Sequence, residues 1–197
     1  MRQKRDEELL AEHLAGKAGA FDALVARYVD GLYGFFQRFV GNAAIAEDLA
    51  QETFLQVHLA AASFHAERTF KPWLYTIAAN KARDYMRSRS RRPLQSLDAA
   101  VSEDGPTPAA LLEAETGPAD AELAADEQIN LVRSIIARMP EHLRMILLMG
   151  YYQKLPYAEI AEVLGIPVGT VKSRLHSAVN HFAQLWHAAD NASAPEK

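Results

Sequence analysis

Six polar side chains in the C-terminal third of the chain have the types and spacing of residues that read DNA. They are Thr170, Lys172, Ser173, Arg174, His176 and Ser177. Donors and acceptors on the free face of a short helix fit the major groove, where base edges carry a distinguishable hydrogen-bonding code. These residues therefore predict recognition of duplex DNA.

The segment Leu155–Val179 supplies the elements that would position these side chains. Its pattern predicts a helix, a turn at Gly165, where glycine tolerates a positive φ, and a second helix after Pro167, which suits a first helical turn. The residues expected to point inward are Ile160, Ala161, Leu164, Val168, Val171 and Leu175. Two amphipathic helices joined by glycine also occur in ordinary α-domains, so plain packing stays an alternative.

Aromatic and basic residues alternate along a second segment, 70–92, where a different chemistry is predicted. Rings stack on unpaired bases with roughly 1–3 kcal/mol per base, and Lys or Arg neutralise phosphates. A pocket for a flipped base also needs polar groups at its rim, for which Asn80 is a candidate. The interleaved residues are Phe70, Lys71, Trp73, Tyr75, Lys81, Arg83, Tyr85 and Arg87. Trp73 at helical spacing also fits a packed core, and Tyr75 fits either place.

The composition favours an all-α protein. Of the 197 residues, 49% are hydrophobic, which is enough for a core, and runs of β-branched residues are few. The absence of cysteine excludes disulfides and Cys-bound zinc within this chain. A charged N-terminus and the lack of any apolar run of about 18–20 residues predict a soluble cytoplasmic protein without a signal peptide or membrane insertion.

Charge is divided between two neighbouring segments. The net charge of −4 conceals two opposite segments. Residues 81–92 contain six basic residues and one acid, whereas residues 95–127 contain nine acids and no base. The position of charge is a better guide to the partner than the sum, so the basic segment fits nucleic acid. The acidic, Pro- and Gly-containing segment is typical of a flexible linker. We expect two small helical domains, 1–93 and 127–187, joined by a flexible acidic linker, 94–126, and followed by a disordered tail, 188–197.

Three segments in this order make the chain resemble a bacterial extracytoplasmic-function (ECF, group IV) RNA polymerase sigma factor. Ala46-Glu-Asp-Leu-Ala-Gln-Glu-Thr-Phe-Leu-Gln-Val57 is similar to the family's helix that docks on the polymerase clamp. The run from Phe70 to Tyr85, followed by Arg91-Arg92-Pro93, is similar to its helix that melts the promoter and reads the minus-ten element. Leu155–Val179, with Gly169-Thr-Val-Lys-Ser-Arg-Leu175, is similar to its minus-thirty-five helix-turn-helix.

The resemblance implies a role for each surface. Polymerase binding would involve Asp48, Gln51, Glu52 and Leu55. Minus-ten capture and melting would involve Phe64, Trp73, Tyr75, Asn80, Lys81, Arg83 and Arg87. Minus-thirty-five recognition would involve Tyr157, Thr170, Lys172, Ser173, Arg174, His176 and Ser177, with Tyr157 near the DNA backbone. His176 and Ser177 stand where an aromatic and a basic residue are frequent in the family, which leaves the promoter sequence open.

The resemblance also implies the partners. They are core RNA polymerase, promoter DNA as duplex and melted single strand, and an anti-sigma factor that wedges between the domains. The acidic linker would thread through polymerase toward the RNA exit path, and polymerase binding would place the chain on the nucleoid. No cofactor, metal or catalytic site is implied, and the scattered histidines form no metal-ligand motif, so we expect no enzyme. Two alternatives stay open: a helix-turn-helix regulator acting without core polymerase, and a sigma-like decoy for an anti-sigma factor.

Overall fold

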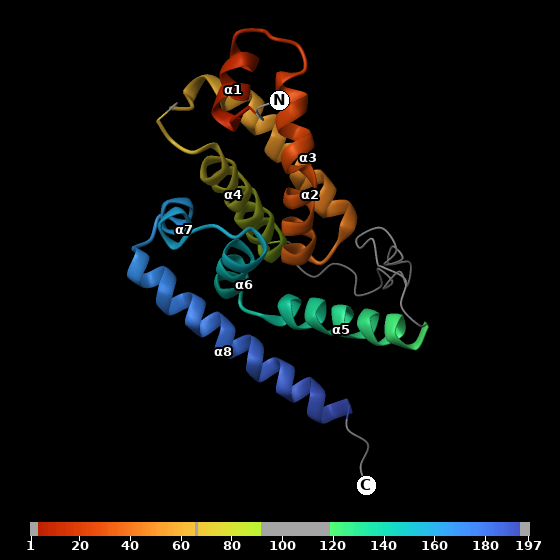
Figure 1. Cartoon of the computed structure of the whole chain (residues 1–197). Helices are drawn as coiled ribbons and strands as arrows, with labels where there is room; N and C mark the ends of the chain where they lie inside the picture. The colour runs from red at the N-terminus through yellow and green to blue at the C-terminus, as the bar shows by residue number, and fades with distance from the viewer. Residues whose placement is uncertain (1–3, 66, 92–118, 194–197) are drawn as a thin grey trace.

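The computed structural model describes residues 4–65, 67–91 and 119–193, and every regular element within these ranges is a helix (Figure 1). The predicted all-α class is therefore confirmed. The N-terminal half consists of α1 (Asp6–Leu14), α2 (Ala20–Val40), α3 (Ala43–Ala60), the short 3-10 turn η1 (Ala61–Ser63) and α4 (Phe70–Arg91). The C-terminal half consists of α5 (Ala119–Arg138), α6 (Glu141–Leu147), the π-helical turn η3 (Leu148–Tyr152), α7 (Tyr157–Leu164) and α8 (Val168–Ser193).

Local capping explains where the helices of the N-terminal half begin and end. Gly41, at φ 73°, terminates α2, and the Asn42 side chain accepts a hydrogen bond from the Ile45 amide at 3.0 Å to cap α3. The cap starts α3 at Ala43, before the segment 46–57 that resembles the clamp-docking helix. α4 begins at Phe70, where a carboxylate oxygen of Glu7 accepts a hydrogen bond from the Phe70 amide at 3.0 Å.

Two segments expected to lack regular structure are partly helical. The first eight residues of α5, 119–126, fall within the predicted linker, and α8 continues through 188–193 of the predicted tail. Both extensions contain several alanines, the strongest helix former, and a growing helix adds residues at low cost once it is nucleated. The rest of the linker and the last four residues lie outside the described residues.

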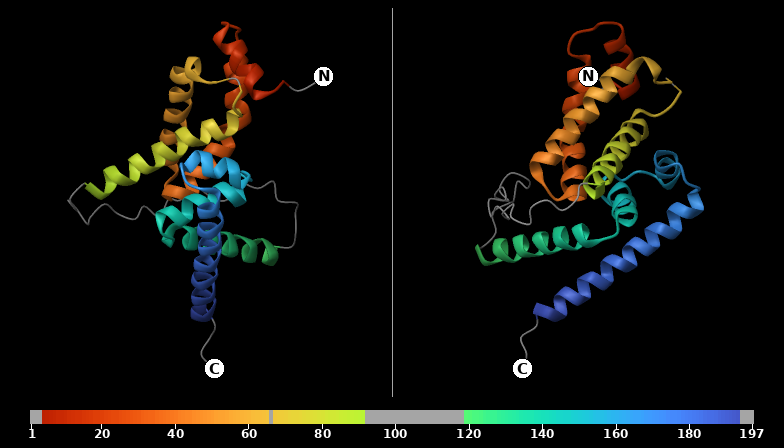
Figure 2. Two further views of the ribbon diagram at one scale, coloured as in Figure 1. Left: turned by 90° about the vertical axis from the view of Figure 1, so that its left-hand side faces the viewer. Right: turned by 180° about the vertical axis from the view of Figure 1, so that it is seen from behind.

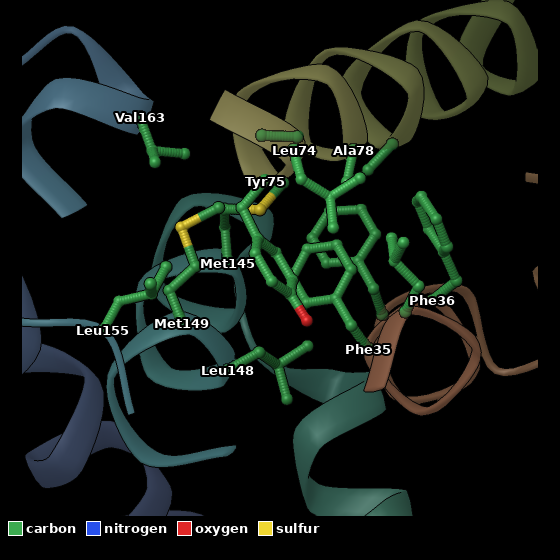
Figure 3. Close-up of a cluster of buried hydrophobic side chains, with 14 of the residues drawn as sticks. Phe35, Phe36, Leu74, Tyr75, Ala78, Met145, Leu148, Met149, Leu155 and Val163 are labelled. Carbon is green, nitrogen blue, oxygen red and sulfur yellow. The ribbon is translucent and has the colours of Figure 1, made fainter. Parts of the chain in front are cut away.

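The two halves pack against each other around one continuous apolar core. α4 lies between α2 and α7, and the end of α8 projects away from the N-terminal half (Figures 1 and 2). Figure 3 shows Phe35 of α2 and Leu74 of α4 converging on Met145 and Leu148 of the C-terminal half. All four side chains are buried, with at most 3% exposed surface. A shared core was not anticipated from the sequence, which indicated two separate domains.

Two buried polar side chains of the C-terminal half reach the N-terminal half. Arg144 donates hydrogen bonds to the carbonyl oxygen of Phe39, near the end of α2, and to those of Ala137 and Met139. Gln153, directly after η3, contacts both α2 and α4. Burial lowers the pKa of the Arg144 guanidinium, and the three carbonyl oxygens stabilise its charge.

Candidate nucleic-acid and polymerase interfaces

The predicted helix-turn-helix is present as α7 and α8. Gly165, at φ 64°, ends α7 in a Schellman motif: the Ile166 amide donates to the Ala161 carbonyl at 3.1 Å and the Gly165 amide donates to the Glu162 carbonyl at 3.3 Å. Val171 is fully buried on the inner side of α8. Val168 is an exception to the expected inner face, because it lies in the first turn and remains 40% exposed.

The outer face of α8 carries the side chains expected to read duplex DNA. Lys172, Ser173, His176 and Ser177 are exposed, and Thr170 and Arg174 are half-buried. The Ser173 and Ser177 hydroxyls donate to backbone carbonyls of their own helix, at 3.1 and 3.0 Å, which leaves their acceptor lone pairs directed outward. The face therefore offers positive charge together with hydrogen-bonding groups.

Asn180 extends this face and was missed in the sequence analysis. Its amide nitrogen lies 3.0 Å from Nε2 of His176. Spacing of four residues places both side chains on one side of the helix, which is the signal that could have identified Asn180. Tyr157, at the start of α7, is 44% exposed and lies outside the α8 face.

The predicted minus-ten residues divide into two groups on and near α4. Phe64 and Trp73 are half-buried, and their ring centroids lie 5.0 Å apart, which brings together two rings separated in the sequence by a loop. Asn80 is exposed, and its side-chain oxygen accepts a hydrogen bond from Arg83 at 3.1 Å. Arg87 is exposed and pairs with Asp84 at 3.5 Å. These residues could meet an unpaired strand without rearrangement of the helix.

Tyr75 lies elsewhere, although it was predicted with this group. Its side chain is only 1% exposed, and its hydroxyl donates a hydrogen bond to the side-chain oxygen of Gln153. Burial raises the pKa of the Tyr75 hydroxyl well above its usual value, so it stays a donor. In this arrangement the ring is not accessible to DNA, because it packs edge-on against Phe35 of α2 and Gln153 of the C-terminal half covers its hydroxyl.

The predicted polymerase-binding residues share the exposed face of α3. Asp48, Gln51 and Glu52 are exposed, and the apolar side chain of Leu55 is 59% exposed. Leu59, one turn further, is 67% exposed and was not singled out in the sequence, although its spacing of four residues from Leu55 could have indicated it. Exposed leucines bordered by acids are typical of a protein-binding surface.

The faces of α3 and α4 meet at one ion pair. Nζ of Lys81 lies 2.8 Å from a carboxylate oxygen of Glu52, joining a predicted DNA-binding residue to a predicted polymerase-binding residue. The pair is solvent-accessible and is therefore worth at most about 1 kcal/mol, so either partner is available for another contact.

Other kinds of site receive no support within the described ranges. No group of three or more metal-ligating side chains is found there. None of the helices in those ranges has the length and apolar character that a membrane span requires.

An apolar groove of about 430 Å³ runs between α5, η3 and α8 and includes Val132, Tyr151 and Phe182.

Comparison with known proteins agrees with these surfaces. Residues 24–92 match the family Sigma-70 region 2, and residues 129–182 match the family Sigma-70, region 4. The chain is 35% identical to the RNA polymerase sigma-H factor of Pseudomonas aeruginosa, over 89% of this chain and 91% of the relative. It is 36% identical to the ECF RNA polymerase sigma factor SigW of Bacillus subtilis, over 82% of this chain and 86% of the relative.

Solved structures share the same architecture. CnrH in complex with the cytosolic domain of CnrY aligns with a TM-score of 0.68 and 26% identity, covering 93% of this chain and 97% of CnrH. The sigma factor RpoE of Bartonella quintana, solved with the anti-sigma factor NepR, shares the fold with a TM-score of 0.65 and 21% identity, covering 86% of this chain and 98% of RpoE. Since both matched regions and the full-length relatives agree, the chain belongs to the ECF family of RNA polymerase sigma factors.

Proposed function

We propose that this chain binds core RNA polymerase and directs it to promoters with a minus-ten and a minus-thirty-five element. The observation that carries the proposal is the presence of three separate exposed surfaces on one chain. They are the acidic and apolar face of α3, the basic and aromatic region of α4, and the donor-bearing face of α8. A regulator acting without polymerase would leave the first two unexplained.

Each surface has a distinct task in this proposal. Lys172 and Arg174 of α8 contact duplex DNA at the minus-thirty-five element, where base-edge hydrogen bonds give specificity. Phe64 and Asn80 receive an unpaired minus-ten base, and the arginines of α4 neutralise phosphates beside it. Asp48, Gln51, Glu52 and Leu55 hold the chain on polymerase, which supplies the catalytic step. The chain itself acts as a binding protein, in the cytoplasm and on the nucleoid with polymerase.

Control by an anti-sigma factor belongs to the same proposal. The exposed leucines of α3 and the apolar groove beside Tyr151, which is 59% exposed, offer two surfaces that a protein partner would cover. The similarity to CnrH, solved with the cytosolic domain of CnrY, supports a protein partner of this kind. An inhibitor occupying these surfaces would compete directly with polymerase for α3.

Run-off transcription tests the proposal. Core polymerase without its own specificity subunit is combined with the chain and a DNA fragment from upstream of the chain's own gene. We expect a discrete transcript that depends on the chain and falls strongly with Arg174→Ala. The control, Gln184→Ala, changes an exposed residue further along α8 and should leave transcription unaltered. Sequence-specific duplex binding without any transcript would support the regulator instead, and absence of core binding would contradict the proposal.

A further inference from the structure

A single glutamine fastens the two halves of the chain together. The carbonyl oxygen of Gln153 accepts a hydrogen bond from Nζ of Lys71 at 2.7 Å, and its side-chain nitrogen donates to the carbonyl oxygen of Gly31 at 3.1 Å. Its side-chain oxygen accepts from the Tyr75 hydroxyl. Gln153 is only 8% exposed, so these bonds lie largely out of water. We call Gln153 and these three partners the clasp.

An unusual backbone segment presents Gln153 to the N-terminal half. η3 is a π-helical turn, closed by the Gln153 amide bonding to the Leu148 carbonyl at 3.0 Å. The next residue, Lys154, has φ 52°, the one positive φ among the described residues other than glycine. π-helical turns and left-handed lysines are both disfavoured, so other contacts must hold them in place. The clasp supplies such contacts.

Further contacts surround the clasp along the same boundary. The guanidinium of Arg38 lies 4.3 Å from the ring centroid of Tyr152, and Arg144 reaches the Phe39 carbonyl. Beside them, the apolar side chains of both halves form the shared core shown in Figure 3. The boundary therefore combines apolar burial with directional polar contacts, as a specific interface does.

This closed arrangement is incompatible with binding both promoter elements at once. The two elements lie about 25 base pairs apart by their names, or about 85 Å along B-form DNA. Halves that share a core cannot span this distance. A fully extended chain of the length of residues 92–118 spans at most roughly 90–97 Å, which is enough once the halves separate. In the closed form the recognition face of α8 is exposed, whereas Tyr75 is covered.

We infer that the clasp holds the free chain in a closed, self-inhibited form, with no partner protein required. The inference rests on the proposed function, because binding of two distant promoter elements is what requires the two halves to separate. Its support is the continuous set of apolar and polar contacts that joins both halves within this one chain. Opening breaks the bonds that Gln153 makes to Lys71, Gly31 and the Tyr75 hydroxyl. The ratio of open to closed molecules then sets how readily the chain joins polymerase at a promoter.

The distance between the halves in the free chain gives the first test. The chain has no cysteine, so Arg68→Cys, just before α4, and Glu162→Cys on α7 accept spin labels specifically. Both side chains are exposed, and they lie 3.9 Å apart across the boundary between the halves. We expect one short distance in the otherwise unchanged chain. Gln153→Ala removes two side-chain hydrogen bonds and should raise the open-to-closed ratio roughly 5- to 100-fold, and Tyr75→Phe should raise it roughly 2- to 10-fold.

A matched control and a second readout keep the test decisive. Tyr33→Phe removes a hydroxyl from α2 that bonds no other described residue, so it should leave the distances unchanged. If the closed form dominates too strongly for labels to detect a shift, Gln153→Ala should still lower, by the same factor, the chain concentration needed to form the complex with core polymerase and promoter DNA.

The outcomes separate this inference from the proposed function. Two results would overturn the clasp while leaving polymerase binding intact. One is a long distance between the labels in the free chain. The other is a folded Gln153→Ala variant that matches Tyr33→Phe both in the label distances and in the concentration needed for complex formation. A chain that never binds core polymerase would overturn the proposed function, and the distances in the free chain would still report on the clasp. If Gln153→Ala does not fold, Tyr75→Phe provides the test, because an unchanged distance between the labels in that variant would overturn the clasp.

Discussion

Replacement of the Arg144 guanidinium should destabilise the chain more than replacement of any exposed arginine. Arg144 is 8% exposed and donates to three backbone carbonyls, with the Met139 bond at 2.9 Å. Ala137 and Met139 lie at the end of α5, and Phe39 lies at the end of α2, so the bonds satisfy carbonyls that no helical amide reaches. The guanidinium therefore closes two helix ends at one point between the halves.

The expected magnitude follows from opposing terms. Hydrogen bonds from a charged donor contribute about 1.5–3 kcal/mol each, so three give a gross stabilisation of about 4.5–9 kcal/mol. Burial of the charge costs several kcal/mol, and this cost disappears with the charge. Met keeps most of the apolar stem that packs beside Phe39, whose ring centroid is 5.6 Å from the guanidinium carbon. We expect Arg144→Met to lower the free energy of unfolding by about 2–4 kcal/mol.

Urea unfolding followed by circular dichroism measures this loss. Arg138→Met is the matched control, because it removes the same charge from an exposed position in the last turn of α5. Its cost should stay below about 1 kcal/mol, the usual limit for a charge near a helix end. Equal stability of Arg144→Met and Arg138→Met would show that the three carbonyls gain nothing from the guanidinium, which would refute the reasoning.

The remaining predictions concern DNA recognition and one turn. Arg174→Ala should weaken binding of the chain with polymerase to a minus-thirty-five duplex by about 1–3 kcal/mol and relax specificity at the base pair that Arg174 contacts. Lys172→Ala should instead weaken binding to all DNA sequences alike and reduce the slope of log affinity against log salt concentration by about 1. Fluorescence anisotropy measures both changes. Asn80→Ala should reduce permanganate reactivity of the opened minus-ten region more than closed-complex affinity, and equal effects would argue against a role in strand capture. Gly165→Ala should lower thermal stability by about 1 kcal/mol, because φ is 64° there, and an unchanged unfolding temperature would contradict this.

Local signals in the sequence predicted the helix-turn-helix. Gly165 and the proline at 167 act within one turn of their own positions, so their effect could be deduced without the rest of the chain. Gly41 and Asn42 similarly set the boundary between α2 and α3. The polymerase-binding residues on the exposed face of α3 were expected from the resemblance of the segment 46–57 to the family's clamp-docking helix.

Contacts between distant segments could not be predicted in the same way. Tyr75 lies on the same helix as the exposed residues of α4, but its ring packs against Phe35 and its hydroxyl bonds to Gln153, 78 positions away. The position of Gln153 depends in turn on the π-helical turn before it, which helical periodicity does not indicate. A pattern of apolar residues shows which face of α4 is covered, but it does not show whether its own half or the other half covers it.

The closed arrangement keeps the two proposed DNA surfaces on one compact body. The α8 face and Asn80 are exposed before opening, whereas the Tyr75 hydroxyl stays bonded to Gln153 until the clasp releases it. The clasp and simultaneous binding of both promoter elements therefore exclude each other. By linkage, any ligand that binds only the open form favours opening by its differential affinity for that form. In the proposed function, polymerase bound to α3 together with promoter DNA bound to α8 acts as such a ligand, and neither needs direct contact with Gln153 to release the clasp.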